Sequence, residues 1–155
     1  MKQDLSLQEK YAPKSICFGC GPANDKGLRI RSFPQGDEMV ATWHAENHHR
    51  AFPGMLNGGI IGALLDCHSN WAAAWYYMQH NKLEKPNATV TANFSVKLFK
   101  PTPSDKPVYL SAEVTDADGR KMTVEAKLEV EGEVCATCIG LFVAVKPGHP
   151  AYDRW

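Results

Sequence analysis

Residues 58–80 read GGIIGALLDCHSNWAAAWYYMQH, and this stretch decides the fold that we predict. It contains no proline, is rich in alanine and leucine and is apolar on nearly every face, as expected of a helix buried on most sides. Asn57 precedes the stretch and is a good N-cap residue, because its side-chain oxygen can accept from the free amides of the first turn. Such a helix extends about 34 Å, so it can lie along the full width of a sheet.

Segments with the alternation of β-strands lie on both sides of the predicted helix. Before it, residues 28–33 and 39–43 form a predicted hairpin, and a loop over residues 44–54 follows. The four predicted strands after the helix cover residues 88–99, 108–115, 122–130 and 133–145. This order favours an α+β fold in which a mostly antiparallel, five- to six-stranded sheet curls around the helix.

The size and charge of the chain restrict its class. With 155 residues it can bury a core without a disulfide or a structural metal. We expect one domain over residues 1–155, with a polar lead-in over residues 1–27. The formal net charge is zero, so neither nucleic acid nor a membrane surface is an expected partner.

Nothing in the sequence predicts export or membrane insertion. The opening MKQDLSLQEKYAPKS lacks the apolar stretch of a signal peptide, and the apolar run over residues 58–65 is too short to cross a bilayer. The five cysteines are an odd number that fits reduced thiols better than a disulfide framework. We therefore expect a cytoplasmic protein.

Two cysteine pairs have the spacing of half a zinc site. Cys17 and Cys20 lie in CFGC, whereas Cys135 and Cys138 lie within a predicted strand, where alternate residues face opposite sides. The sequence offers no further ligand pair at suitable spacing beside Cys17 and Cys20. We therefore expect neither a bound metal nor another cofactor.

Four short motifs carry a family resemblance. They are CFGCGPAN at residues 17–24, FPGMLNGGII at residues 52–61, Leu-Leu-Asp at residues 64–66 and TANFSVKLFKP at residues 91–101. With these motifs the sequence resembles the phenylacetate-type (PaaI-like) and THEM-type acyl-CoA thioesterases of the hotdog fold. The family commonly has histidine where this chain has Asn57. The resemblance implies the hotdog fold, an acyl-CoA substrate and a homo-oligomer, either a dimer or a dimer of dimers.

The groups that thioester hydrolysis needs lie on the predicted helix. Hydrolysis requires donors for the carbonyl oxygen as it becomes negative, and a base or nucleophile at the carbonyl carbon. Gly58 and Gly59 lie at the helix N-terminus, where amides lack intrahelical acceptors, although paired glycines also permit tight packing. Asp66 interrupts an apolar stretch, where burial raises the pKa of a carboxyl group. The resemblance implies that Asp66 is the general base or nucleophile.

Other residues are candidates for positioning or binding. In a purely structural interpretation Asp66 bonds to Asn70 one turn later or to a neighbouring backbone group. Asn70 is also a candidate substrate contact. Thr91 aligns with a hydroxyl residue that orients water in related thioesterases, although threonine also suits a strand. Asn57 is either a cap alone or a cap that also touches the acyl carbonyl. His68 is interpreted as a hydrogen-bonded core or interface histidine.

Coenzyme A carries several phosphates, so a local group of basic residues is expected. Arg120 and Lys121 lie in a predicted turn, and Lys97 and Lys100 lie near the end of a predicted strand. Each of the four is equally well explained as a solvated surface charge.

Helix geometry predicts that the site is shared between subunits. Asp66 lies about 12 Å along the helix from Gly58 and about 80° around it, so the two cannot hold one thioester within one chain. A two-fold dimer with antiparallel helices brings Asp66 of one chain to the helix N-terminus of the other.

Two other functions stay open, whereas the absence of Gly-x-Ser-x-Gly excludes an α/β-hydrolase. One is a hotdog dehydratase or hydratase acting on acyl-CoA or acyl-carrier protein, which pairs a loop histidine with a helix carboxylate; His49 has an unsuitable spacing for this. The other is a non-catalytic acyl-CoA-binding module. Ligand-sensing relatives carry a DNA-binding domain, for which the residues before Cys17 are too few.

Overall fold

The long helix lies at the centre of the structure, a computed structural model that describes residues 4–155. Helix α2 spans Gly58–His80, the range predicted from the sequence. The side chain of Asn57 accepts a 3.1 Å hydrogen bond from the amide of Ile60, as an N-cap does. Both the helix and its cap are therefore confirmed.

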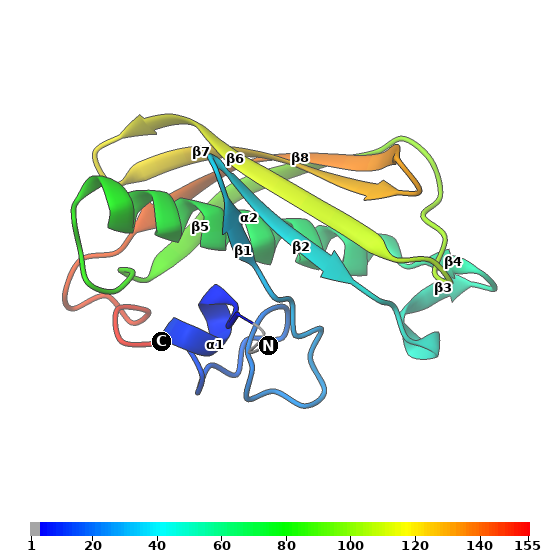
Figure 1. Cartoon of the computed structure of the whole chain (residues 1–155), viewed down its shortest axis with the longest axis horizontal. Coiled ribbons are helices and arrows are strands. Elements are labelled where there is room, and N and C mark those ends of the chain that lie inside the picture. Colours follow the sequence, from blue (N-terminus) through cyan, green and yellow to red (C-terminus); the bar gives the residue numbers. More distant parts are fainter. Residues whose placement is uncertain (1–3) are drawn as a thin grey trace.

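A six-stranded sheet covers one side of α2 (Figure 1). Its strands are β1 (Phe33–Gln35), β2 (Glu38–Trp43), β5 (Thr89–Leu98), β6 (Val108–Asp118), β7 (Lys121–Val130) and β8 (Glu133–Ala144). The order in space is β1-β2-β6-β7-β8-β5, and every neighbouring pair is antiparallel. Helix α2 packs against every strand from β2 to β5 in this order. The sheet is open, so β1 and β5 are its edges, and the whole is the α+β hotdog arrangement that we expected.

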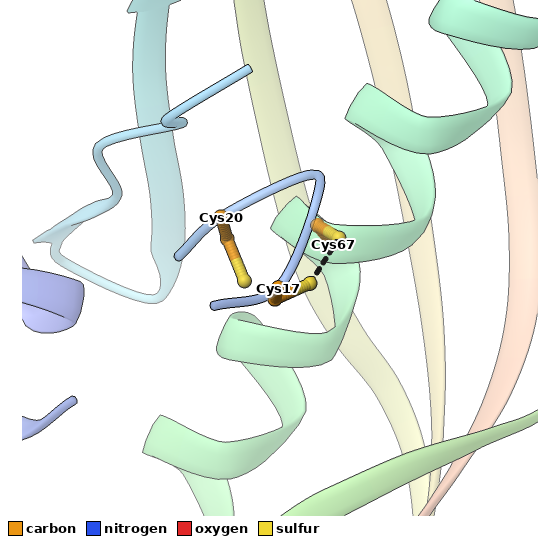
Figure 2. Close-up of side chains that lie close together, drawn as sticks. All are labelled: Cys17, Cys20 and Cys67. Carbon is orange, nitrogen blue, oxygen red and sulfur yellow. Dashed lines mark hydrogen bonds between the residues drawn. The ribbon is translucent and has the colours of Figure 1, made fainter. Parts of the chain in front are cut away.

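The N-terminal segment and the C-terminal tail cover the other side of α2 (Figure 1). The ring of Trp155 stacks on that of Trp71 with centroids 4.2 Å apart. The loop that carries Cys17 and Cys20 lies against α2 at Cys67 (Figure 2). These contacts explain why the helix is apolar on nearly every face.

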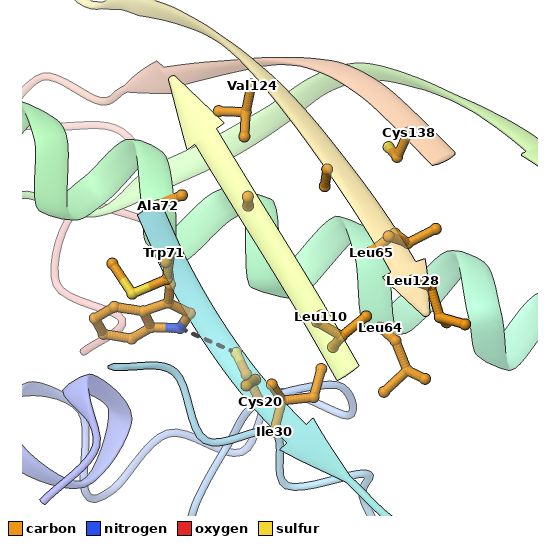
Figure 3. Close-up of a cluster of buried hydrophobic side chains, with 14 of the residues drawn as sticks. Cys20, Ile30, Leu64, Leu65, Trp71, Ala72, Leu110, Val124, Leu128 and Cys138 are labelled. Carbon is orange, nitrogen blue, oxygen red and sulfur yellow. Dashed lines mark hydrogen bonds between the residues drawn. The ribbon is translucent and has the colours of Figure 1, made fainter. Parts of the chain in front are cut away.

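The core lies between α2 and the sheet (Figure 3). Leu64 and Leu65 of the helix are fully buried, as are Leu110 of β6 and Val124 and Leu128 of β7. Along β7 the buried positions alternate with partly or fully exposed ones, as expected of a strand with one covered face. All five cysteines are free thiols, as predicted.

The N-terminal lead-in is more ordered than the sequence interpretation implied. Helix α1 (Leu7–Tyr11) begins with a capping box, in which the side chain of Ser6 accepts from the amide of Glu9 and the Glu9 carboxylate accepts from the amide of Ser6. The buried side chain of Gln8 ties this short helix to Ser32. Residues 1–3 of the predicted lead-in lie outside the described residues.

The strand predicted over residues 28–33 is wrong for most of its length. Arg29 has a φ of 55°, which interrupts an extended chain. The amides of Leu28 and Ile30 bond to the carbonyl oxygens of Phe18 and Gly19 instead of to a strand. Of the predicted strand, Phe33 alone lies in a strand, as the first residue of β1, and Leu28 and Ile30 bond to the cysteine loop.

The loop predicted over residues 44–54 contains short regular elements. They are the 3-10 helix η1 (Asn47–His49) and the paired strands β3 (Arg50–Phe52) and β4 (Met55–Leu56). Gly54 allows the chain to reverse between the two strands, because its φ of 82° is readily adopted only by glycine. Within residues 4–155, neither α-helix has the length and apolar character needed to span a membrane.

Candidate active site

One stripe of α2 faces the edge strand β5 at intervals of four residues. In helix order it consists of Gly58, Gly62, Asp66 and Asn70, which lie beside Leu98, Phe94, Thr91 and Thr89, respectively. The two glycines lie at ordinary contact range of β5: a Cβ on Gly58 would lie 3.5 Å from Leu98 Cδ1 and one on Gly62 3.9 Å from Phe94 Cε2. Beyond the glycines, polar contacts replace these apolar ones.

Asp66 and Thr91 are joined directly. Thr91 Oγ1 donates a 2.6 Å hydrogen bond to Asp66 Oδ1, which fixes the orientation of a partly buried carboxylate. Burial raises the pKa of Asp66 and is the largest influence on it, whereas the hydrogen bond from Thr91 lowers it. The neighbouring Cys17 also raises the pKa of Asp66, and the positive charge of Arg154 lowers it. The second oxygen, Oδ2, has no hydrogen-bond partner among residues 4–155.

Asn70 bonds to β5 and not to Asp66 in the described structure. Its Nδ2 donates to the carbonyl oxygen of Thr89 at 3.4 Å, and Thr89 Oγ1 donates to the carbonyl oxygen of Asn70 at 3.3 Å. The structural alternative for Asp66, a bond to Asn70, is therefore not formed. Asn70 Oδ1 is buried without a partner, so an acceptor stays available one turn beyond the carboxylate.

The first turn of α2 presents two unused donors. The Asn57 side chain accepts a hydrogen bond from the amide of Ile60, and the Asn57 carbonyl oxygen accepts one from the amide of Ile61. The amides of Gly58 and Gly59 have no acceptor among residues 4–155, and both glycines are exposed. A Cβ on Gly59 would lie 3.0 Å from Asn57 Oδ1, so a side chain there would disturb the cap. Unpaired amides at a positive helix end are suited to a developing oxyanion.

The basic candidates fall into two groups at opposite ends of β5. Lys97 is exposed, and Lys100 forms an ion pair with Glu133; both lie near the start of α2. Arg120 donates to the carbonyl oxygens of Ala144 and Val145, at the opposite end of β5. Lys121 is exposed beside it. Within one chain, the four basic residues therefore do not lie together.

Two residues near Asp66 escaped sequence analysis. Arg154 Nη2 donates a 2.6 Å hydrogen bond to the carbonyl oxygen of Thr89, which places a cation close enough to lower the pKa of Asp66. The tail carries no motif that predicts this; Trp155 is its one hint, because a terminal tryptophan can anchor a tail. Cys67 follows Asp66 on α2 and faces Cys17 and Cys20 (Figure 2). Cys17 and Cys67 are 50 positions apart, so no local sequence pattern predicts their contact.

His68 is a core histidine, as interpreted from the sequence. It is fully buried, and its ring nitrogens bond to Ser32 Oγ and to the carbonyl oxygen of Met39, each at 2.8 Å. Because a carbonyl oxygen only accepts, Nε2 carries the proton and Nδ1 accepts from Ser32. Burial lowers the pKa of His68 to about 4, so the ring stays neutral and takes no visible part in the site.

The architecture is that of the hotdog fold: an open antiparallel sheet on one long helix, with free amides at the helix start and an acid two turns on. The Thioesterase superfamily pattern matches residues 53–137, more than half of the chain. This chain belongs to the Thioesterase superfamily, as the motifs predicted. Membership supports thioester hydrolysis as its general activity.

Solved structures share this fold. A Thioesterase superfamily protein from Shewanella loihica PV-4 is 26% identical, with a TM-score of 0.66 over 81% of this chain and 98% of that one. The PaaI protein of the E. coli phenylacetic acid degradation operon is 13% identical, with a TM-score of 0.64 over 77% of this chain and 81% of that one. A phenylacetic acid degradation-related protein from Ralstonia eutropha JMP134 is 17% identical, with a TM-score of 0.65 over 81% and 92%. At their identities the last two show a shared fold only. No curated protein matches this chain.

Proposed function

We propose that this protein hydrolyses acyl-CoA or aryl-CoA thioesters to the free acid and coenzyme A at sites shared by two subunits. The observation that carries the proposal is the 2.6 Å hydrogen bond from Thr91 to Asp66, which aims a partly buried carboxylate from inside an otherwise apolar helix. A buried carboxylate costs free energy, which favours a role for it in chemistry. Family membership adds the reaction class.

The proposed reaction needs three groups. The amides of Gly58 and Gly59 donate to the thioester carbonyl oxygen, so that negative charge can develop on it. As a general base, Asp66 takes a proton from a water molecule whose oxygen attacks the carbonyl carbon. The tetrahedral intermediate then collapses, the C–S bond breaks, and the thiolate of coenzyme A leaves. Thr91 holds the carboxylate in position for this step.

A nucleophilic role for Asp66 is chemically equivalent in outcome. In that route a carboxylate oxygen attacks the carbonyl carbon, coenzyme A leaves as a thiolate, and water hydrolyses the resulting mixed anhydride. A single turnover in ¹⁸O-labelled water distinguishes the two routes. Label in the Asp66 carboxylate after one turnover supports the anhydride. Label confined to the product acid, with no acyl group trapped on Asp66 by hydroxylamine during turnover, supports the general base.

Two features support a site between subunits. The edge strand β5 has a free side, and exposed apolar side chains lie on it and directly after it, with Phe94 44%, Leu98 57% and Phe99 61% exposed. Leu98 lies against the exposed start of α2, so one face would bury both the strand edge and the helix N-terminus. In the single chain, a hollow of about 840 Å³ is lined by residues such as Arg31, Tyr109 and Lys127 and by none of the helix stripe. A partner would therefore have to complete the enclosure of the substrate.

The contacts of His49 do not favour the dehydratase alternative. Its side chain is buried, and Nδ1 accepts a 2.9 Å hydrogen bond from the amide of Glu46 in its own turn. Burial lowers the pKa of His49. The histidine is thus committed to the turn that precedes β3, and no described contact links it to Asp66.

The first test is thiol release from short, long and aromatic CoA esters by the purified protein. We expect Asp66→Asn to lower kcat about 100- to 10,000-fold, the usual contribution of a general base, with the fold and the oligomeric mass unchanged. Asp118→Asn, on the exposed β6–β7 hairpin, is the matched control and should leave kcat unchanged. Full activity of Asp66→Asn would remove the mechanism; ester binding without turnover by the unaltered protein would favour the binding module.

A second test addresses the shared site. Asp66→Asn and Gly58→Pro each remove a different half of the site, so each homodimer should be inactive. After mixing and subunit exchange, half of the dimers are mixed and each has one intact site, which restores about a quarter of the original activity. Activity no greater than the sum of the two parents would place both groups in one subunit.

A further inference from the structure

The thiols of Cys17, Cys20 and Cys67 meet where the N-terminal loop touches α2 (Figure 2). Their Sγ atoms all lie within 4.8 Å of one another, and those of Cys17 and Cys67 are 3.8 Å apart. In a tetrahedral zinc site with Zn–S bonds of about 2.3 Å, neighbouring sulfur atoms are about 3.8 Å apart. The pair Cys17 and Cys67 already has this spacing, and the sulfur of Cys20 lies no more than 4.8 Å from each of the two.

The loop is built to hold this arrangement. A Cβ on Gly19 would lie 2.3 Å from Cys67 Sγ, and one on Gly21 would lie 2.4 Å from the backbone nitrogen of Cys17. Only glycine at these two positions lets the loop close tightly and press on the helix. The amide of Gly21 also donates to the carbonyl oxygen of Cys17 at 2.8 Å, which fixes the turn between the two loop cysteines.

A hydrogen-bond donor reaches the cluster from α2. The indole Nε1 of Trp71 donates to Cys20 Sγ at 3.3 Å. Such a donor stabilises negative sulfur and orients it, which is the role of the outer shell at a metal centre.

The cluster places three potential thiolates in contact. Three thiolates repel one another, and a divalent cation between them balances their charge, because cysteines bind a metal in the deprotonated form.

From this geometry we propose that Cys17, Cys20 and Cys67 bind one Zn²⁺ ion, with a solvent molecule as the fourth ligand. Thiolate sulfur selects soft or borderline ions such as zinc, and no fourth cysteine, histidine or carboxylate of residues 4–155 joins the group. Binding releases the thiol protons to solvent and forms three Zn–S bonds without any change of oxidation state. The ion ties the loop to α2 at the residue that follows Asp66.

This proposal replaces our expectation of no metal. That expectation rested on the lack of a second ligand pair beside Cys17 and Cys20 in the sequence. Cys67 comes from the middle of α2, 47 positions after Cys20, and the helix supplies it only once the loop has folded against it. The proposal does not depend on the reaction proposed above, because its test measures metal binding and not hydrolysis.

The test is zinc binding by the full, reduced chain, followed by chelator competition and by substitution with Co²⁺. We expect one ion per chain, and for Co²⁺ the sulfur-to-metal charge-transfer absorption of a tetrahedral thiolate site. Cys67→Ser and Cys17→Ser should each weaken zinc binding more than about 100-fold. Cys135→Ser, at a buried thiol of β8 outside the cluster, is the matched control and should bind zinc as the unaltered protein does.

Three results would overturn the proposal. The first is less than one equivalent of zinc bound at micromolar concentrations. The second is unchanged binding in both Cys17→Ser and Cys67→Ser, which would place the ion elsewhere; because Cys17 lies in the loop, its variant remains informative if Cys67→Ser does not fold. The third is a Cys17–Cys67 disulfide that forms in the presence of zinc, seen as a linked peptide by mass spectrometry, which would assign the cluster to redox chemistry.

Discussion

Replacing Gly58 by proline removes one proposed oxyanion donor with little change to the helix. Gly58 is the first residue of α2, where proline is favoured because its φ of about −65° suits the helix and its missing N–H has no intrahelical acceptor. The residue before a proline must be extended, and Asn57 already is, with φ −66° and ψ 136°. The cap from Asn57 to Ile60 uses neither the amide nor the side chain of position 58.

Gly58→Pro should have a large effect on activity and a small effect on stability. Loss of one oxyanion donor lowers kcat by about 100- to 1,000-fold, which corresponds to about 2.7–4 kcal/mol of transition-state stabilisation. Stability should change by less than about 1 kcal/mol, because the Gly58 amide has no acceptor in residues 4–155 and a compatible proline reduces the entropy of the unfolded chain. The melting temperature should therefore move by no more than about 4 °C.

Gly58→Ala is the matched control, since it adds a Cβ and keeps the amide. That Cβ would lie 3.5 Å from Leu98 Cδ1, an ordinary contact. Thiol release and thermal melting are measured for both variants. If the alanine variant loses as much activity as the proline variant, the loss is steric; if a folded proline variant keeps full kcat, the Gly58 amide is not a donor to the oxyanion.

Three further results are expected. Thr91→Val should lower kcat/KM about tenfold or more, because a hydrogen bond to a charged group is worth about 1.5–3 kcal/mol, and Thr91→Ser should restore most of it; equal activity of the two variants would contradict a role for the hydroxyl. The folded pKa of His68 is lowered from 6.5 to about 4, so its contribution to stability is complete above about pH 7 and about 3 kcal/mol of it is lost between about pH 6.5 and 4. Urea unfolding at several pH values should show a shallower acid slope for His68→Gln, and identical slopes would contradict this. Asn57→Ala should lower the free energy of unfolding by about 1 kcal/mol, with Asn57→Ser close to the original, as an N-cap requires.

The main elements could be predicted because their causes are local. The bounds of α2 follow from its cap and its unbroken apolar run, and the alternation of buried and exposed residues marks β7. Helix α1 also had a local signal, the Ser-x-x-Glu spacing of Ser6 and Glu9, which is a capping box. The failure at residues 28–32 has a different cause. There the backbone amides are satisfied by the cysteine loop, and a non-local contact overrides a strand-like sequence.

The candidate site divides in the same way. The free amides at Gly58 and Gly59 follow from helix geometry, and Asp66 is conspicuous as a carboxylate in an apolar stretch. The hydrogen bond from Thr91 could not be predicted, because the sequence does not show which residue of β5 lies beside Asp66, the third position of the stripe. The position of Arg154 near Asp66 could not be predicted either, because it depends on the path of the C-terminal tail, which neither periodicity nor motif spacing encodes.

Three consecutive residues on α2 face three different neighbours. Asp66 bonds to Thr91 of the edge strand, Cys67 meets Cys17 of the N-terminal loop, and His68 bonds to residues on the remaining side. Successive helical positions are about 100° apart, so the rotation of α2 about its axis assigns all three at once. Because Asn57 fixes where the helix begins, one residue inserted between the cap and Asp66 would turn the carboxylate away from Thr91, the thiol away from the loop and the imidazole out of its pocket. The catalytic proposal and the zinc proposal rest on separate observations, yet both depend on the same helical register.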